Sequence, residues 1–300
     1  MARPRAEVAT LRDAAVTTGF RLSSVAAGRP PKALRRPVLN AVADRVWARR
    51  GAGVRQLEAN LSRAAPDADA RELSRVAMRS YVRYWDEAFA LPRWSSAQIY
   101  ERIRTHHAER LRDPLAAGQG VLAVLPHMGN WDHAGAWACL EGMPVTTVAE
   151  RLHPAGVYDQ FVAQRAALGM EVVALTGGPP TVPLLSARLR AGRFVCLLAD
   201  RDLSQTGQEV ALLGEPARLP RGPALLARRT GAVLLPITSD YQGEQMNLRM
   251  HAPIEVGSGS GAVARATQQM ADAFTAAIRL APGDWHLLQP VFSADLDGRR

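Results

Sequence analysis

The sequence lacks any apolar run long enough to cross a lipid bilayer. A membrane-spanning helix needs about 20 mostly apolar residues, and the best candidate, residues 115–131, is interrupted by glycine, glutamine and proline. The first residues also lack the pattern that marks a secretory signal, a charged region followed by an apolar stretch of about 7 to 15 residues. These absences predict a protein that is not secreted and whose contact with membranes is peripheral.

Lysine and cysteine are scarce. Lys32 is the only lysine, so nearly all of the positive charge behind the formal net charge of +9 is arginine. An arginine-rich surface suits phosphate-bearing partners such as nucleic acid, anionic lipid or a nucleotide-containing cofactor, although a GC-rich genome also enriches arginine. The two cysteines, Cys139 and Cys196, lie in apolar runs without metal-ligand spacing, which predicts reduced core residues in a cytosolic chain.

Apolar residues are abundant, and their pattern changes along the chain. They make up 47% of the 300 residues, enough for one large α/β domain or two small ones, and we expect one. Residues 1–112 show helical spacing broken by proline and glycine, which predicts a helical N-terminal layer. Residues 113–300 alternate short Val- and Leu-rich runs with amphipathic segments, which predicts a mixed, mainly parallel sheet flanked by helices.

The predicted strands of this α/β core are Gly120–Leu125, Val145–Ala149, Val172–Leu175, Phe194–Ala199 and Val233–Thr238. The predicted helices are Trp131–Leu140, Ala155–Leu168, Val182–Ala191, Arg221–Arg229 and Val263–Leu280. In the N-terminal layer, apolar residues between Val8 and Val25 recur at approximately helical spacing. Such a helix either lies in a membrane interface or packs on its own domain.

The strongest local signal for chemistry is the run L-P-H-M-G-N-W-D-H at residues 125–133. An apolar strand ends just before His127, and Asp132 follows five residues later. Five positions of a continuous helix rotate by about 140°, so the two side chains meet only if His127 precedes the helix. Gly129 permits a tight turn and Asn130 is a good N-cap residue. We therefore expect Asp132 to bond Nδ1 of His127, which leaves Nε2 free as a general base.

Two other interpretations of this run remain open. A metal site is the weaker one, because His127, Asp132 and His133 do not reproduce the i, i+4 pair of a zinc helix, and no metal is expected. The histidine and the aspartate also suit a buried structural hydrogen bond, which spacing alone does not distinguish from a catalytic pair. Their predicted place at the carboxyl end of a strand is where open α/β sheets bind ligands.

His127 and Asp132, directly after a strand, resemble the H-x4-D motif of the glycerolipid acyltransferase superfamily. Further runs narrow this resemblance: Y-V-R-Y-W-D-E-A-F at Tyr81–Phe89, T-V-A-E-R-L at Thr147–Leu152, A-D-R-D-L at Ala199–Leu203 and D-W-H-L-L-Q-P at Asp284–Pro290. Together they resemble the branch that contains the lipid A late acyltransferases, and most closely the actinobacterial phosphatidylinositol mannoside acyltransferases. The similarity extends from about Val16 to Asp295.

This resemblance implies a glycerolipid acyltransferase-like fold and a peripheral enzyme on the cytoplasmic face of the plasma membrane. The implied acyl donor is an acyl-CoA, often palmitoyl-CoA, and the implied acceptor is a mannose hydroxyl of phosphatidylinositol mannosides. The protein is expected to contact an anionic membrane surface and to bind no cofactor permanently. Alternatives are acylation of another glycolipid from acyl carrier protein, and a non-catalytic lipid-binding protein. Nucleic-acid binding, which the net charge alone permits, lacks a recognition motif and is not expected.

The resemblance also implies roles for charged residues outside the motif. Glu150 follows the predicted strand Val145–Ala149, and Arg165 lies on the next predicted helix. Both match functional positions of the mannoside acyltransferases, so we expect them beside the polar acceptor. The alternative is an ordinary surface ion pair. Asp200 follows the predicted strand Phe194–Ala199, at a position where those enzymes usually have glutamate. It is also expected to bind the acceptor, either directly or, because aspartate is one methylene shorter, through water. Arg218 precedes the predicted helix Arg221–Arg229 and Arg221 begins it. These two arginines, or the N-terminus of that helix, are expected to bind the phosphates of acyl-CoA, unless they form only a solvated helix end.

In the mechanism that these expectations define, His127 takes the proton of the sugar hydroxyl while Asp132 orients the imidazole. Backbone N–H groups near the start of the following helix, or a nearby arginine, would stabilise the oxyanion. Trp285 and His286 belong to the run D-W-H-L-L-Q-P, and they either contribute to the active site or pack in the core.

Overall fold

The computed structural model describes residues 18, 27, 31–151, 154–178, 180–204 and 206–297, and it confirms the predicted α/β fold. Its main sheet has seven strands in the order β1-β9-β8-β2-β5-β3-β4. All neighbouring strands are parallel except β8 and β9. The strands are β1 (Ile103–His106), β2 (Val121–Leu125), β3 (Val145–Ala149), β4 (Glu171–Ala174), β5 (Phe194–Leu198), β8 (Val233–Gln242) and β9 (Gln245–Met250).

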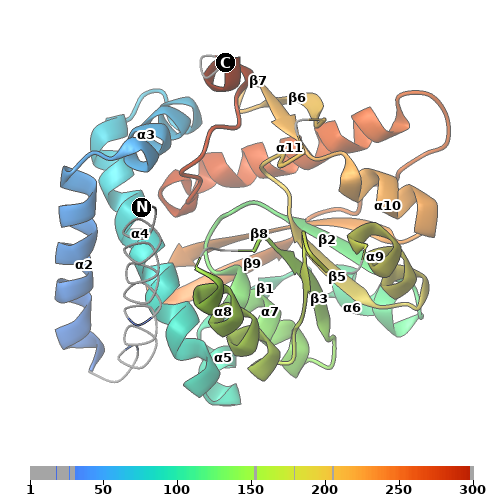
Figure 1. Cartoon of the computed structure of the whole chain (residues 1–300), viewed down its shortest axis with the longest axis horizontal. Helices are drawn as coiled ribbons and strands as arrows, with labels where there is room; N and C mark the ends of the chain where they lie inside the picture. Colours follow the sequence, from blue (N-terminus) through green and yellow to red (C-terminus); the bar gives the residue numbers. More distant parts are fainter. Residues whose placement is uncertain are drawn as a thin grey trace, which may run out of the picture.

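Helices cover both faces of the sheet (Figure 1). One apolar cluster joins a face of the sheet to α9 (Thr181–Arg190), α10 (Gly222–Thr230) and α11 (Ala262–Leu280). A second cluster joins the other face to α5 (Ser96–Glu101), α6 (Glu109–Ala116) and α7 (Trp131–Leu140). The central strand β2 is buried at every position, which explains why it reads as an unbroken apolar run in the sequence.

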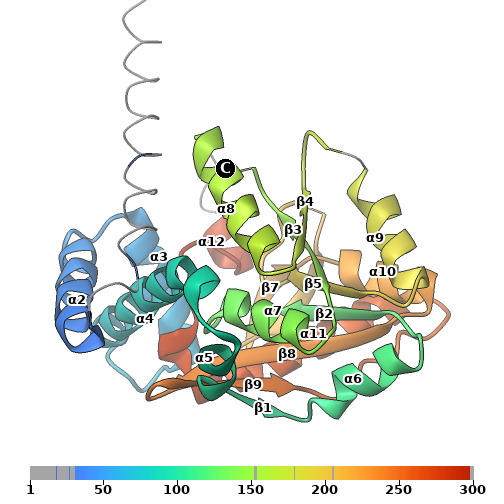
Figure 2. The same cartoon turned by 90° about the horizontal axis from the view of Figure 1, so that it is seen from below.

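Three helices of the N-terminal layer lie together at one end of the sheet (Figures 1 and 2). They are α2 (Lys32–Ala48), α3 (Ala52–Ala64) and α4 (Ala70–Ala90), and both α2 and α3 pack against α4. The short helix η1 (Leu91–Arg93) and α5 follow, and then β1, which pairs with β9. The predicted helical N-terminal layer of residues 1–112 thus also contains a strand, β1, which the sequence did not predict because four residues are too short to show a period. The amphipathic segment predicted between Val8 and Val25 lies outside the described residues, apart from Thr18.

The remaining predicted elements each have a counterpart in the structure, including α8 (Ala155–Ala167). The hairpin of β6 (Gln208–Leu212) and β7 (Glu215–Leu219), which stands apart from the main sheet, was not foreseen. After α11 the chain forms η2 (Pro282–Asp284) and α12 (Ser293–Asp297). Both cysteines are free and half-buried. Among the described helices, none combines the length and the apolar character that a membrane span requires.

Candidate active site

Three neighbouring strands end at one edge of the sheet and lead to charged residues that the sequence singled out. β2 leads to His127, β5 leads to Asp200 and β3 leads to Glu150. Because β5 lies between β2 and β3 and all three are parallel, their carboxyl ends meet. This edge is where parallel α/β sheets bind their ligands.

The turn after β2 holds His127 outside the helix that follows. Gly129 has a φ of 62°, a left-handed conformation that glycine adopts without strain. A Cβ atom added at this glycine would lie 2.6 Å from Ser239 Oγ, so the turn also packs tightly. Asn130 accepts a hydrogen bond from the backbone N–H of His133 at 2.9 Å and caps α7. The prediction that the helix begins after Asn130 is confirmed.

The imidazole of His127 is paired with Asp200. Its Nδ1 lies 2.5 Å from Asp200 Oδ1, and its backbone N–H donates to Asp200 Oδ2 at 2.9 Å. The side chain of His127 is 29% exposed, whereas that of Asp200 is 0% exposed. The prediction that Asp132 bonds Nδ1 is therefore wrong, and a fully buried Asp200 offers no surface for direct contact with an acceptor. A carboxylate that accepts from Nδ1 leaves Nε2 as the basic nitrogen.

Asp200 is ionised despite its burial. Removal from water alone would raise the pKa of this carboxyl, but the charge and the hydrogen bonds of His127, together with a hydrogen bond from Trp285, outweigh that effect and lower the pKa below its ordinary value. The negative charge at Nδ1 is therefore present at neutral pH, and it favours a proton on that nitrogen.

Asp132 belongs to a separate buried cluster. Arg165 on α8 donates from Nε and Nη2 to its two carboxylate oxygens at 2.6 and 2.9 Å, and the hydroxyl of Tyr84 on α4 donates at 2.8 Å. Burial, followed by the charge of Asp132, raises the pKa of Tyr84 well above its ordinary value, so the hydroxyl keeps its proton. Because Asp132 lies on the face of α7 that contacts α4 and α8, it ties these three helices together and does not reach His127.

The other predicted site residues lie in two places. Glu150 accepts from Arg201 at 2.9 Å, in an exposed ion pair next to Asp200 in the chain. This position suits a polar acceptor and a surface ion pair equally. Arg218 lies on β7 and Arg221 is exposed at the start of α10. Within the described part of the chain, the side chains of these two arginines form no ion pair, and the structure does not join them to His127.

The segment Asp284–His286 forms backbone hydrogen bonds with the turn that carries His127. The backbone N–H of His286 donates to the carbonyl of His127 at 2.7 Å, and that of Gly129 donates to the carbonyl of Asp284 at 3.0 Å. The run D-W-H was the sequence signal for this segment, but the spacing gave no indication of what it contacts. No group of three or more potential metal ligands gathers among the described residues.

His286 gives this region a pH-dependent stability. Burial, and to a smaller extent His127, lowers the pKa of its imidazole from 6.5 to about 3. Below pH 6.5 the unfolded chain therefore binds a proton that the folded chain does not, so the free energy of unfolding falls as the pH falls toward 3. Between pH 7 and pH 5 we expect this group to cost about 2 kcal/mol.

Urea unfolding of the wild type and of His286→Gln at both pH values measures this contribution. Glutamine retains an N–H for Ser80 Oγ, which lies 3.0 Å from His286 Nε2, but it does not titrate. The variant should therefore lose less stability than the wild type on acidification, whatever its stability at pH 7. Equal losses in the two proteins would contradict the buried neutral histidine.

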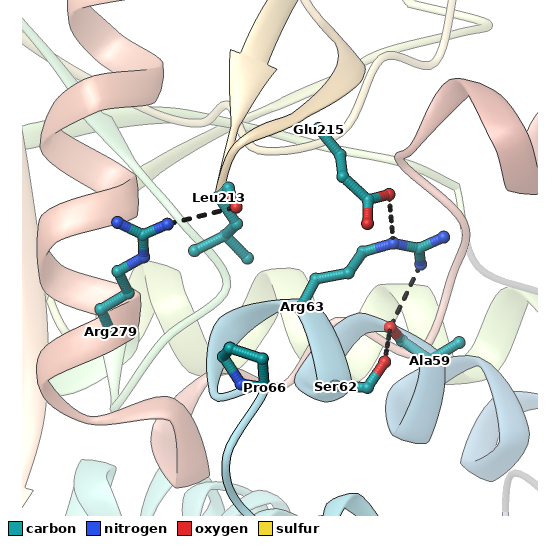
Figure 3. A pocket seen from close by; sticks show the side chains of 7 residues that line it. All are labelled: Ala59, Ser62, Arg63, Pro66, Leu213, Glu215 and Arg279. Carbon is teal, nitrogen blue, oxygen red and sulfur yellow. Dashed lines mark hydrogen bonds and ion pairs between the residues drawn. The ribbon is translucent and has the colours of Figure 1, made fainter.

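A cavity of about 410 Å³ lies between α3, the β6–β7 turn and α11 (Figure 3). Arg63 faces it and donates to Glu215 at 2.7 Å and to Asp295 at 2.8 Å, while Arg279 donates to the carbonyl of Leu213 at 3.2 Å. Two carboxylates thus balance the two arginines. None of the residues that line this cavity contacts His127.

A second, apolar cavity lies on the other side of Trp131 from His127. It has a volume of about 20 Å³ and lies between the sheet and α7, with Leu125, Trp131, Ala134 and Ile237 among its lining residues. The ring of Trp131 is 5.6 Å from the ring of His127. Trp131 therefore separates the apolar interior from the imidazole.

Comparison with known proteins identifies the family of this chain. The family model for the bacterial lipid A biosynthesis acyltransferase matches residues 18–294. The chain is 42% identical over 274 residues to a phosphatidylinositol mannoside acyltransferase of Mycolicibacterium smegmatis, across 90% of this chain and 89% of that protein. It is 43% identical over 262 residues to a phosphatidylinositol mannoside acyltransferase of Mycobacterium tuberculosis, across 85% of this chain and 82% of that protein. With nearly its whole length matched, the chain belongs to the bacterial lipid A biosynthesis acyltransferase family.

Proposed function

We propose that this acyltransferase moves a long-chain acyl group from acyl-CoA to a mannose hydroxyl of a phosphatidylinositol mannoside. The observation that carries the catalytic part is the 2.5 Å contact between His127 Nδ1 and the buried carboxylate of Asp200. Two relatives that are 42% and 43% identical and are named for phosphatidylinositol mannoside support the choice of acceptor.

In this proposal His127 is the general base. Its Nε2 takes the proton of the mannose hydroxyl as the oxygen attacks the thioester carbonyl, and Asp200 stabilises the imidazolium. Collapse of the tetrahedral intermediate breaks the C–S bond and completes the ester, while His127 returns the proton to the departing thiolate. The N-terminus of α7 follows the His127 turn, and its first N–H groups and helix dipole favour the negative charge of the oxyanion.

We place the acyl chain in the apolar region between the sheet and α7. The cavity there begins beside Trp131 and has apolar walls. Its volume of about 20 Å³ is close to that of a single water-sized probe. A palmitoyl chain therefore enters only if the side chains of α7 move apart.

The surface of α2 supports a peripheral position on an anionic membrane, which we place at the cytoplasmic face of the plasma membrane. Leu34, Val38, Val42 and Val46 recur every four residues along this helix and are between 43% and 68% exposed. Side chains at this spacing share one face of a helix. An exposed apolar face on an arginine-rich protein is typical of helices that lie in an interface with anionic lipids.

Transfer of radiolabelled palmitate from palmitoyl-CoA to purified phosphatidylinositol mannosides tests the proposal. We expect labelled mannoside on thin-layer plates with the wild type, and at least about 100-fold less with His127→Ala. His107→Ala is the matched control, because His107 is an exposed histidine whose side chain pairs with Glu109 and, among the described residues, makes no contact with His127 or Asp200. Its activity should equal that of the wild type.

Parallel reactions with acylated acyl carrier protein as donor, and with a lipid A precursor as acceptor, identify the alternatives. The absence of product on every mannoside acceptor would contradict the proposed acceptor. Product formation by His127→Ala at the rate of the wild type would contradict the proposed base.

A further inference from the structure

The buried carboxylate of Asp200 accepts hydrogen bonds from two different segments. Oδ1 faces Nδ1 of His127, whereas Oδ2 accepts from the backbone N–H of His127 at 2.9 Å and from Nε1 of Trp285 at 3.0 Å. Asp200 and Trp285 are both 0% exposed, so no water competes for these bonds. Each oxygen of the carboxylate therefore has its own defined donors.

Trp285 is itself held from both sides. It forms an isolated β-bridge with Met128, inside the turn that carries His127. The preceding residue, Asp284, accepts from Ser80 Oγ at 2.6 Å and from the backbone N–H of Tyr241 at 2.7 Å. The backbone at Trp285 is thus bridged to the His127 turn, and its neighbour Asp284 is bonded to α4 and to β8, which holds this segment beside Asp200.

We propose that Trp285 is a positioning residue for the acyl transfer, because its indole N–H fixes the rotation of the Asp200 carboxylate and thereby keeps Oδ1 on Nδ1 of His127. The argument follows from the donors. A carboxylate only accepts hydrogen bonds, and without the indole N–H the Oδ2 atom keeps a single donor, the backbone N–H of His127, so rotation about the Cβ–Cγ bond is less restricted. Hydrogen-bond partners that orient metal-bound histidines and carboxylates typically change activity by about 10- to 100-fold when they are lost, and we expect an effect of this size here. The proposal rests on the assignment of His127 as the base.

Trp285→Phe tests the proposal, because phenylalanine keeps an aromatic ring but has no N–H group. We expect kcat to fall by about 10- to 100-fold with little change in KM, and the acid limb of the pH profile of kcat/KM to shift. Trp47→Phe is the matched control: Trp47 also loses an indole hydrogen bond, to Ser74 Oγ at 2.9 Å, but it does not contact Asp200. A folded Trp285→Phe with kcat within about twofold of the wild type and an unchanged pH profile would overturn the proposal.

Proton NMR tests the same geometry without any acyl transfer. The short bond between His127 Nδ1 and Asp200 predicts a far-downfield Nδ1–H resonance in the wild type that moves in Trp285→Phe and stays in place in Trp47→Phe. If the proposed reaction is not observed at all, this readout still decides the positioning role.

A second test, which keeps Trp285 and changes its acceptor, applies if Trp285→Phe does not fold. Of the six tryptophan indole N–H resonances, the one that belongs to Trp285 should move upfield in Asp200→Asn, because its acceptor loses its charge. An unchanged set of indole resonances in Asp200→Asn would overturn the proposal.

Discussion

Asp200→Asn should lower kcat by about 10⁴-fold, which is the size of the effect when the aspartate of a Ser-His-Asp triad becomes asparagine. Oδ2 of Asp200 accepts from two donors, the backbone N–H of His127 and the indole of Trp285. An amide must present its only oxygen to these donors, so its NH₂ group faces Nδ1 of His127. Nδ1 then has to accept, the proton moves to Nε2, and the nitrogen that should act as the base is blocked.

Steady-state kinetics of the purified variant measures this loss. Asp202→Asn provides the matched control, because Asp202 accepts from Ser204 and Gly207 in an adjacent turn and makes no bond to His127. We expect near wild-type kcat for this control. Activity of Asp200→Asn within about tenfold of the wild type would show that His127 works without a carboxylate on Nδ1.

Arg165→Met should lower the free energy of unfolding by about 3–5 kcal/mol, because it leaves the Asp132 carboxylate buried without its cation. Arg165 and Asp132 form two parallel hydrogen bonds, and both side chains are buried. Tyr84 remains as a single donor and does not neutralise the charge. Chemical unfolding at neutral pH measures the loss, and Asp132→Asn combined with Arg165→Met should recover part of it.

The control for this change is Arg188→Met. Arg188 pairs with Glu171 through the same two-bond geometry, but these side chains are 36% and 37% exposed. An exposed pair contributes only about 0 to 1 kcal/mol, so the two arginine variants should differ by several kcal/mol. Equal losses would mean that burial of the Asp132 charge has no energetic cost.

The main elements of the fold were readable from the sequence because burial leaves a local signature. β2 and β5 carry unbroken apolar runs, and α11 has a long amphipathic pattern ended by the proline of η2. β1 is only four residues long, and β9 alternates polar and apolar residues beside an edge strand. Strands of this kind are recognised by their pairing partners, which a single sequence does not reveal.

Only the local part of the candidate site could be predicted from the sequence, for a related reason. The turn geometry around Gly129 and the cap at Asn130 are local, and they place His127 correctly before α7. The partner of His127 is decided by strand order, which puts β5 next to β2. Motif spacing therefore pointed to Asp132, whereas the neighbouring strand supplies Asp200. Trp285 was visible only as part of a family-like run.

The distances in sequence between these partners have a consequence for folding. His127 and Asp200 are 73 positions apart, and Asp200 and Trp285 are 85 apart. Contacts of such separation form late, because the entropy of closing long loops must be overcome before parallel strands pair. A collapsed intermediate with its helices formed but its strands unpaired would have a helical circular dichroism signal and an unpaired histidine. Recovery of enzymatic activity during refolding thus reports the pairing of β2 with β5 and the docking of the segment that carries Trp285.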